Sequence, residues 1–255
     1  MTAEEKTQVA RFLDLAGDYL GTGYRSPERN YVFSGDPAPV LAALAPEAVS
    51  GGSDRAADTL ESIAADVRLC AACPLCKTRI QAVPGEGVDR PLVLVIGEGP
   101  GADEDASGRP FVGKAGRLLD DMLAARGQIG LYRDKNCFIA NVVKCRPPEN
   151  RDPLPEETAA CAPFLARQIA LLKPLLILAV GRISAQTLLK TGEGIGKLRG
   201  RFYDYGGVPL LPTYHPSALL RSGELKRPAW EDLKKLRTKL TELYPGFGAA
   251  AQSEL

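Results

Sequence analysis

The sequence predicts an α/β sandwich with a mostly parallel central sheet. Two fully apolar runs, residues 92–96 and 175–180, are each closed by a glycine, which is typical of parallel strands buried on both faces. Helically patterned segments lie between such runs, and this alternation favours a parallel sheet covered by helices. A chain of 255 residues is long enough to bury a sizeable core in one or two domains.

The first 58 residues are expected to form a helix and a flexible extension ahead of the main domain. Near the start of the chain, helical spacing is shown by the apolar residues Val9, Phe12, Leu13, Ala16 and Leu20. Residues 21–55 are rich in Gly, Ser, Pro and Ala, a composition typical of a linker or surface excursion. We therefore place the main domain at residues 59–245, followed by a tail at 246–255.

The main domain is expected to alternate helices and strands from Thr59 onward. A helix leads into Cys70 and a strand covers 92–96; then come a helix from Ala115, a strand from Cys137 and a helix from Pro155. Two glutamates follow Pro155, which suits a helix start because acidic groups favour the positive end of the helix dipole. Residues 201–205 and 208–212 flank a Gly-Gly pair and predict a hairpin near the sheet edge.

The charge of the chain excludes a polycation that coats nucleic acid, because the formal net charge is only +1. Residues 197–240 nevertheless carry ten Lys and Arg residues against four acidic ones, a bias that attracts phosphates. For residues 234–239 a solvated helix face is favoured, since that helix has an apolar stripe of Trp230, Leu233, Leu236 and Leu240. The N-terminus shows no leader and no membrane-spanning stretch, so we expect a cytoplasmic protein that acts as a monomer.

Six cysteines in a reducing compartment indicate metal binding, redox chemistry or core packing rather than disulfides. Cys70, Cys73 and Cys76 form a double C-x-x-C, and Cys145 and Cys161 flank a proline-rich loop much later in the chain. One C-x-x-C pair with two distant cysteines supplies four thiolates, enough for a tetrahedral zinc site or a four-iron cluster. Spacing alone does not choose between these metals. The remaining cysteine, Cys137, stands in an apolar run and is expected to be a core residue.

The segment after the 92–96 strand carries three closely spaced glycines that allow a ligand to approach the backbone, Gly97, Gly99 and Gly101. A dinucleotide-binding turn is a poor match, because the spacing is G-x-G-x-G and Pro100 removes an N–H donor. Residues 108–114, GRPFVGK, resemble a phosphate-binding P-loop. Against that interpretation, Ala115 stands where Ser or Thr should hold Mg²⁺, and no strand immediately precedes Gly108.

Two polar residues lie in or directly after predicted strands. Asn141 lies inside an apolar strand, so its amide is either tied into the core or waiting for a ligand. His215 is the only histidine and follows a strand in a proline-bounded turn, a place where catalytic side chains can be held rigidly. A lone histidine is more often structural or exposed, but this setting favours a function.

Four features of the chain resemble the bacterial and archaeal family 4 uracil-DNA glycosylases, which carry an iron-sulfur cluster. They are GEGPGADEDASGRPFVGKAG, IANVVKCRPPENRDPLPEE, Cys161 and HPSALLR, in unbroken order within residues 60–240. The resemblance implies a three-layer α/β/α sandwich and a [4Fe-4S] cluster. It also implies a base-excision-repair enzyme that flips uracil out of single- or double-stranded DNA and hydrolyses its N-glycosidic bond, leaving an abasic site.

The resemblance carries roles onto individual positions of this chain. Cys76 and Cys137 are left without a role, and the cluster ligands are Cys70, Cys73, Cys145 and Cys161. The uracil-binding positions are Glu98, Gly99, Pro100, Phe111, Asn141 and His215. Related glycosylase families place a water-activating Asp in the glycine turn, but Gly99 occupies that position here.

Each of these side chains suits a step of base excision. Phe111 can stack on the flipped base, and the Asn141 amide can pair with O4 and N3–H of uracil but mismatches cytosine. His215, as neutral imidazole or as imidazolium, can donate to O2 of the departing uracil anion. We expect Glu104 to orient the attacking water and Glu98 to brace the loop. Asp103 and Asp105 are as easily explained as a helix N-terminal acidic cluster.

DNA contacts are expected from Leu219, Leu220 and Arg221, with the leucines as an apolar wedge and the arginine meeting a phosphate. The cluster is expected to hold residues 146–151 near the DNA backbone, while a redox role stays open. Three alternatives are a metal-stapled DNA-binding module without catalysis, a P-loop phosphotransferase, and a sibling branch that bonds covalently to uracil-DNA. The covalent branch uses a histidine in a basic insertion, and this chain has no second histidine.

Overall fold

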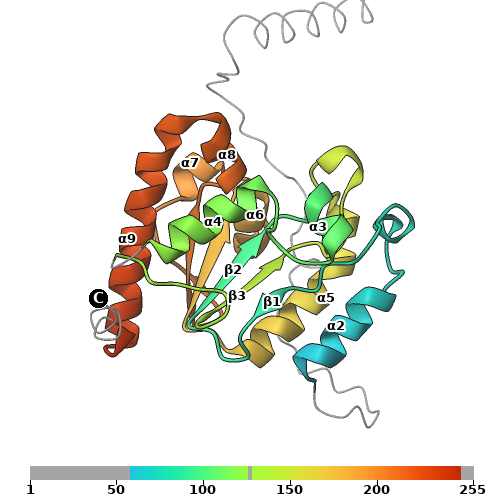
Figure 1. Cartoon of the computed structure of the whole chain (residues 1–255), viewed down its shortest axis with the longest axis horizontal. Coiled ribbons are helices and arrows are strands. Elements are labelled where there is room, and N and C mark those ends of the chain that lie inside the picture. The colour runs from blue at the N-terminus through green and yellow to red at the C-terminus, as the bar shows by residue number, and fades with distance from the viewer. Residues whose placement is uncertain (1–57, 126–127, 248–255) are drawn as a thin grey trace, which may run out of the picture. The chain divides into compact units, whose positions relative to one another are not determined.

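A six-stranded sheet forms the centre of the part of the chain that the structure describes (Figure 1). The structure is a computed structural model that describes residues 58–125 and 128–247. The expected helix in the first twenty residues, the 21–55 extension and tail residues 248–255 lie outside the described residues. The domain limits at 59 and 245 stay predictions.

The sheet is mostly parallel, as the sequence predicts. Its spatial order is β1-β3-β2-β4-β6-β5. The four inner strands run parallel, and they are β3 (Cys137–Asn141), β2 (Val93–Gly97), β4 (Leu176–Val180) and β6 (Val208–Thr213). The edge strands β1 (Glu86–Gly87) and β5 (Tyr203–Tyr205) are antiparallel to their neighbours. β2 lies between β3 and β4, so the chain changes direction across the sheet at β2, and ligands of open α/β sheets bind at such switch points.

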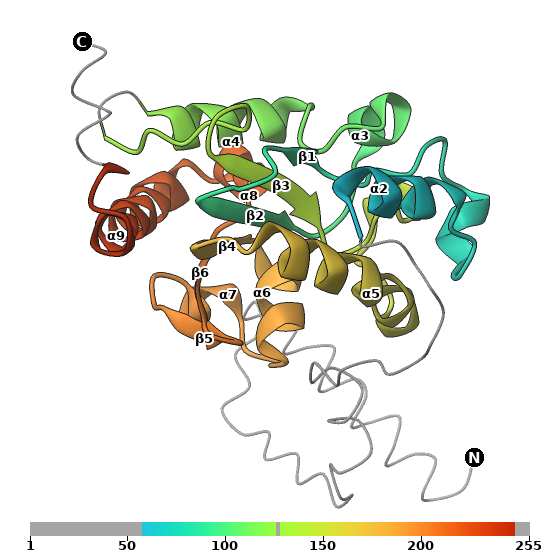
Figure 2. The ribbon, with the colours of Figure 1, turned by 90° about the horizontal axis from the view of Figure 1, so that it is seen from below.

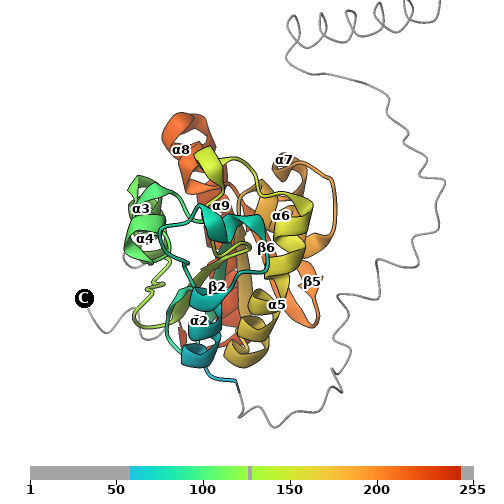
Figure 3. The same ribbon diagram turned by 90° about the vertical axis from the view of Figure 1, so that its right-hand side faces the viewer.

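Helices cover both faces of the sheet, which confirms the three-layer sandwich (Figures 2 and 3). One core contains residues of α2 (Leu60–Leu69), α5 (Pro155–Leu172), α6 (Arg182–Leu189) and α7 (Ile195–Leu198). The opposite core contains residues of α4 (Lys114–Ala124) and α9 (Lys226–Leu243). Shorter helical segments complete the described chain, and they are η2 (Pro74–Lys77), α3 (Ala102–Ser107), η3 (Pro148–Asn150), α8 (Pro216–Arg221) and η4 (Gly223–Leu225).

The buried strands divide their side chains between the two cores. In β2, Leu94 and Ile96 face the α5 side, whereas Val93 and Val95 face the α4 side. This two-residue alternation explains why the sequence is apolar without a break, since neither face of the strand meets water. Cys137 is buried in the α4-side core, as predicted, and burial raises the pKa of its thiol to about 12.

The predicted element boundaries are confirmed within one or two residues. α2 begins after Thr59, whose side chain accepts a hydrogen bond from the Ser62 backbone in a capping box. The hairpin of β5 and β6 turns through Gly206 and Gly207, both at positive φ, as a tight hairpin turn requires. The apolar stripe of α9 is buried in the α4-side core as predicted. Among the described helices, none has the length and apolar character needed to cross a membrane.

Candidate active site and cysteine cavity

The predicted site residues lie where parallel strands end. Residues 98–101 follow β2, Asn141 is the last residue of β3, and His215 stands two residues after β6. Phe111 lies in the loop between α3 and α4. Because the carboxyl ends of parallel strands meet at one edge of a sheet, residues more than seventy positions apart reach a common place.

Phe111, Asn141 and His215 meet at this edge. The ring centroids of Phe111 and His215 are 5.7 Å apart, with the planes tilted by 34°. A Cβ atom on Gly97 would overlap Oδ1 of Asn141 and lie 2.6 Å from Cζ of Phe111. The phenyl ring and the carboxamide therefore approach each other over Gly97, and only glycine leaves them room.

The carboxamide oxygen of Asn141 has no hydrogen-bond partner. The residue is 1% exposed, and its Oδ1 is the only buried side-chain N or O atom within the described residues that lacks a hydrogen bond. Leaving a buried acceptor unpaired costs about 1–3 kcal/mol. Of the two alternatives left open by the sequence, this atom favours an amide that awaits a ligand.

The hydrogen bonds of His215 assign its proton. Its side chain caps α8, where Nδ1 accepts from the Ser217 backbone N–H at 3.2 Å and lies 2.8 Å from Ser217 Oγ. A ring nitrogen that accepts a backbone N–H carries no proton, so the proton of the neutral ring is on Nε2. Burial, aided by the positive charge of Arg221 and opposed by Glu104, lowers the pKa of His215 to about 4. At neutral pH the ring is a neutral Nε2–H donor.

The loop that carries Phe111 is held from two sides. Phe111 has φ of +52°, a strained value for a non-glycine residue. Arg133 donates to the Pro110 carbonyl at 3.0 Å and to the Phe111 carbonyl at 3.1 Å, and Asp120 fixes Arg133 through a 2.7 Å ion pair. Sequence reasoning missed Arg133, because a lone arginine 22 residues from Phe111 forms no motif.

Glu104 holds the other side of the same loop, a contact that the sequence led us to expect of Glu98. Its Oε1 accepts from the backbone N–H groups of Val112 at 2.8 Å and Gly113 at 2.9 Å, and its Oε2 accepts from Gly101 at 3.0 Å. With both oxygens bound to backbone, Glu104 braces the loop, the role predicted for Glu98. The water-orienting role expected of Glu104 stays a prediction.

Glu98 has the opposite environment. It is partly buried, and no hydrogen bond reaches its carboxylate within the described part of the chain. Burial, reinforced by the nearby Asp152 carboxylate and opposed by Arg182, raises the pKa of Glu98 to about 7. A carboxylate that is unengaged and titrates near neutral pH suits acid–base work better than bracing.

The other residues of segment 98–108 shape the chain and hold it in place. Asp105 is buried and accepts from the Ile80 and Gln81 backbones, so it ties two loops together. Gly99 packs so closely that a Cβ would lie 2.8 Å from Val143 Cγ2, and Pro100 is buried. Gly108 ends helix α3 at φ of +71°, so residues 108–114 follow a helix and not a strand, which excludes the P-loop alternative.

The three residues predicted to contact DNA do not share one environment. Leu220 is 51% exposed and Arg221 is exposed, but Leu219 is only 2% exposed. Successive residues of a helix point about 100° apart, so α8 buries one leucine and presents the next. The prediction of Leu219 as a surface contact was wrong, and Leu220 is the leucine available for a wedge.

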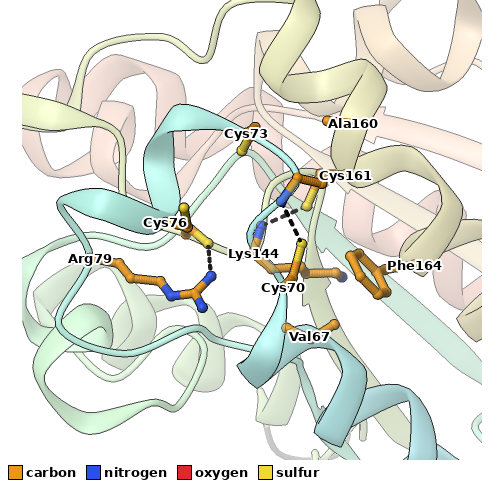
Figure 4. A pocket seen from close by; sticks show the side chains of 11 residues that line it. Val67, Cys70, Cys73, Cys76, Arg79, Lys144, Ala160, Cys161 and Phe164 are labelled. Carbon is orange, nitrogen blue, oxygen red and sulfur yellow. Dashed lines mark hydrogen bonds between the residues drawn. The ribbon is translucent and has the colours of Figure 1, made fainter.

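Five cysteines line one cavity on the α5 side of the protein, hereafter the cysteine cavity (Figure 4). They come from the end of α2, the segment at η2, the chain after β3 and helix α5, and they are Cys70, Cys73, Cys76, Cys145 and Cys161. Cys76, expected to be without a role, thus lies with the four predicted ligands.

Donors point at these sulfurs. Arg79 Nη1 lies 3.0 Å from Cys145 Sγ, and the Lys144 backbone N–H lies 3.2 Å from Cys161 Sγ. Burial raises the pKa of the Cys161 thiol to about 11, so a thiolate at that position requires a cation or metal beside it. Across 58–125 and 128–247, no three metal-ligating side chains are arranged to hold a single metal ion.

Comparison with known proteins agrees with this geometry. The family model of the uracil DNA glycosylase superfamily matches residues 84–234. A type-4 uracil-DNA glycosylase of Saccharolobus solfataricus is 44% identical over 192 residues, which cover 72% of this chain and 88% of the relative. Type-4 enzymes of Sulfurisphaera tokodaii and Thermotoga maritima are 45% and 44% identical, covering 71% of this chain in each case and 84% and 94% of the relatives. The chain has an unpaired carboxamide at the switch point of its sheet, and it matches these relatives over most of their length. With the match to the family model, these observations show that the chain belongs to the uracil-DNA glycosylase superfamily.

Proposed function

We propose that the protein is a uracil-DNA glycosylase of the type-4 kind, which extrudes uracil from DNA and hydrolyses its N-glycosidic bond. The observation that carries this function is the unpaired, buried Oδ1 of Asn141 beside the rings of Phe111 and His215. An acceptor held in this way matches N3–H of uracil, whereas cytosine has no hydrogen on N3. The discrimination is strong, because cytosine would leave buried polar atoms unpaired.

The other two side chains of the group bind and activate the base. Phe111 offers a ring face to the flipped uracil, a contact worth roughly 1–3 kcal/mol per base. The Nε2–H of His215 can donate to uracil O2, where negative charge develops as the bond breaks. The neutral imidazole can donate its Nε2–H to the uracil anion while keeping that proton. Because the pKa of His215 is lowered to about 4, the ring is neutral at physiological pH.

Glu98 is the carboxylate that we assign to the water. Hydrolysis places positive charge on the sugar and requires a water on the face opposite the departing base. An unengaged carboxylate with a pKa near 7 can orient that water, accept its proton and stabilise the sugar cation. Glu104 acts indirectly, since its hydrogen bonds hold the Phe111 loop.

Cys70, Cys73, Cys145 and Cys161 are the residues that we propose as ligands of a [4Fe-4S] cluster. Their sulfurs line one cavity, and four thiolates are the ligand set that a four-iron cluster takes. The cluster would supply a covalent link between distant segments and would take no part in bond cleavage. Leu220 and Arg221 would face the DNA. We further propose that the protein acts as a monomer in the cytoplasm.

The direct test uses cluster-loaded protein and an oligonucleotide that carries one deoxyuridine. We expect an alkali-labile abasic site at the uracil and none in a matched oligonucleotide with cytosine at that position. DNA binding without excision by protein with full iron content would overturn the enzymatic function. That result would instead support the metal-stapled DNA-binding module.

A further inference from the structure

Lys144 is a lysine whose whole side chain is inside the protein. It is 1% exposed and is the only buried lysine or arginine in the part of the chain that the structure describes. Its Nζ donates to the backbone carbonyl of Asn141 at 2.9 Å and to Oε1 of Gln168 at 2.7 Å. Gln168 is itself 2% exposed, and its Nε2 donates to the Pro84 carbonyl at 2.8 Å.

The backbone of Lys144 belongs to the wall of the cysteine cavity. Its N–H donates to Cys161 Sγ, and its carbonyl accepts from the Val83 backbone at 2.7 Å. Cys145 is the next residue in the chain. A single residue thus connects the end of β3, helix α5, the segment before β1 and the cysteine cavity, where Figure 4 shows it beside Cys161.

Burying an ammonium group next to neutral acceptors is costly, because two carbonyl-type oxygens return only part of its hydration energy. No carboxylate within the described residues forms an ion pair with Lys144. In that part of the chain, the one ionisable group that acts on the Lys144 charge is the Cys161 thiol, whose sulfur also accepts from the Lys144 backbone N–H. Four thiolates holding a cluster form an anionic group, and a buried cation beside it offsets that charge.

The contact with Asn141 has a direct consequence for the carboxamide. Oδ1 of Asn141 has no partner of its own, so nothing on that side of the amide fixes its position before a base binds. The backbone at the end of β3 determines where the carboxamide points, and Lys144 holds that backbone by its carbonyl. A displacement of about 1 Å at a group that orients a substrate can cost on the order of a hundredfold in rate.

We propose that Lys144 is a positioning residue that couples the cysteine cavity to uracil recognition. Its ammonium fixes the end of β3 through the Asn141 carbonyl, while its backbone is anchored at the Cys161 sulfur. The proposal rests on the proposed role of Asn141 and deepens it. The link gives the metal site a function in base recognition that requires no redox step.

The test combines Lys144→Met with Asn141→Ala in a double-mutant cycle, measured by single-turnover uracil excision with excess enzyme. Methionine has a similar length but neither donates nor carries charge. We expect Lys144→Met to lower kcat/KM by roughly ten- to a hundredfold. In the Asn141→Ala background the same change should cost less than about twofold, because the group it positions is gone. Exposed Lys77, beside Cys76, supplies the matched control Lys77→Met, which should leave kcat/KM unchanged.

A second readout does not depend on activity. The reduction potential of the bound iron should shift to more negative values in Lys144→Met, since a nearby positive charge favours the reduced, more anionic state. The Lys77→Met control should leave it within error. Iron content and thermal midpoint should be measured on each variant. If Lys144→Met does not fold, Gln168→Leu removes one anchor of the ammonium and should give a smaller loss with the same non-additivity.

The outcomes separate this proposal from the proposed function. Wild-type protein that excises no uracil removes the enzymatic role, and the potential shift then still reports on the charge of Lys144. If the wild type is active, two results overturn the positioning role. The first is that Lys144→Met or Gln168→Leu protein with full iron content keeps the kcat/KM of the wild type. The second is a loss that adds in full to that of Asn141→Ala.

Discussion

Two glutamates six residues apart take different roles because their surroundings differ. Glu104 has both oxygens on backbone N–H groups, whereas Glu98 is unengaged and has its pKa raised to about 7 by burial and by Asp152. The sequence alone could not separate them, since the partners of Glu104 are main-chain groups that any residue would supply. Their assignment depends on where the loops fold.

Glu98 should make uracil excision depend on pH. Because the carboxylate form is the active one, the single-turnover rate should rise with pH through about 7 and then level off. Glu98→Gln should lose this rise and at least a hundredfold of the rate, as estimated for a lost general base. A rate profile unchanged in shape in Glu98→Gln would contradict the assignment.

The same residue should weaken the fold as pH rises. The folded state holds the Glu98 proton up to about pH 7 and the unfolded chain releases it near 4.5, so its contribution to stability falls between these values. Glu98→Gln should therefore gain stability over the wild type as pH rises from 4.5 to 8, by roughly 1–2 kcal/mol, since solvent screens a carboxylate that is only partly buried. Urea unfolding at the two pH values measures the difference, and equal curves would count against a raised pKa.

Asn141 should show a conflict between stability and activity. Replacing it with leucine, of similar size, removes a buried acceptor that has no partner, so the free energy of unfolding should rise by about 1 kcal/mol or stay unchanged. Uracil excision should fall by at least about a hundredfold, as expected when the hydrogen-bonding specificity group is lost. A strongly destabilised Asn141→Leu would show that the amide is tied into the core after all.

The loop between α3 and α4 is held in place from two sides. Arg133 holds two of its carbonyls and Glu104 holds two of its N–H groups, which keeps Phe111 at a strained φ of +52°. Gly116 allows α4 to approach, because a Cβ there would overlap the Phe111 carbonyl. The loop is therefore set before substrate arrives.

Removing the Arg133 contacts should slow excision without unfolding the protein. Arg133→Met should lower kcat/KM by roughly tenfold or more, because a misplaced stacking ring loses base contacts worth roughly 1–3 kcal/mol. The exposed Arg90→Met serves as the control and should match the wild type. Unchanged kinetics in Arg133→Met would mean that Glu104 alone fixes the loop.

How far the sequence could predict the structure depended on the range of each interaction. Strands β2 and β4 were predictable because both of their faces are apolar, and α5 because Pro155 and two glutamates mark its start. The burial of Leu219 could not be predicted, because a six-residue helix has too few turns for its sequence to show which face is buried. The Lys144–Gln168 and Arg133–Phe111 bonds join distant segments through one atom pair each, and no local pattern marks them.

The cysteine cavity and the sheet edge that carries Asn141 are joined by β3 and the chain that follows it. The cavity joins α2, η2, the chain after β3 and α5, and the chain after β3 follows directly on Asn141, the last residue of that strand. A metal group in the cavity would fix distant segments to one another and, through them, the base-reading end of β3.

Cysteine variants should reveal which thiols hold the metal. Cys70→Ala should lose iron and lower the thermal midpoint, because a missing ligand leaves the group incompletely held. Cys76→Ala should keep iron and activity, since Cys76 lines the cavity but lies outside the proposed ligand set. Iron per protein and visible absorbance measure both. Loss of iron from Cys76→Ala alone would exchange the two roles.

A crystal structure with free uracil bound would show whether Phe111, Asn141 and His215 converge on one base. We expect the base to lie flat against the Phe111 ring, with its N3–H on Asn141 Oδ1 and its O2 on His215 Nε2. Uracil bound elsewhere, or seated there in an orientation that leaves Asn141 Oδ1 without a partner, would contradict this expectation.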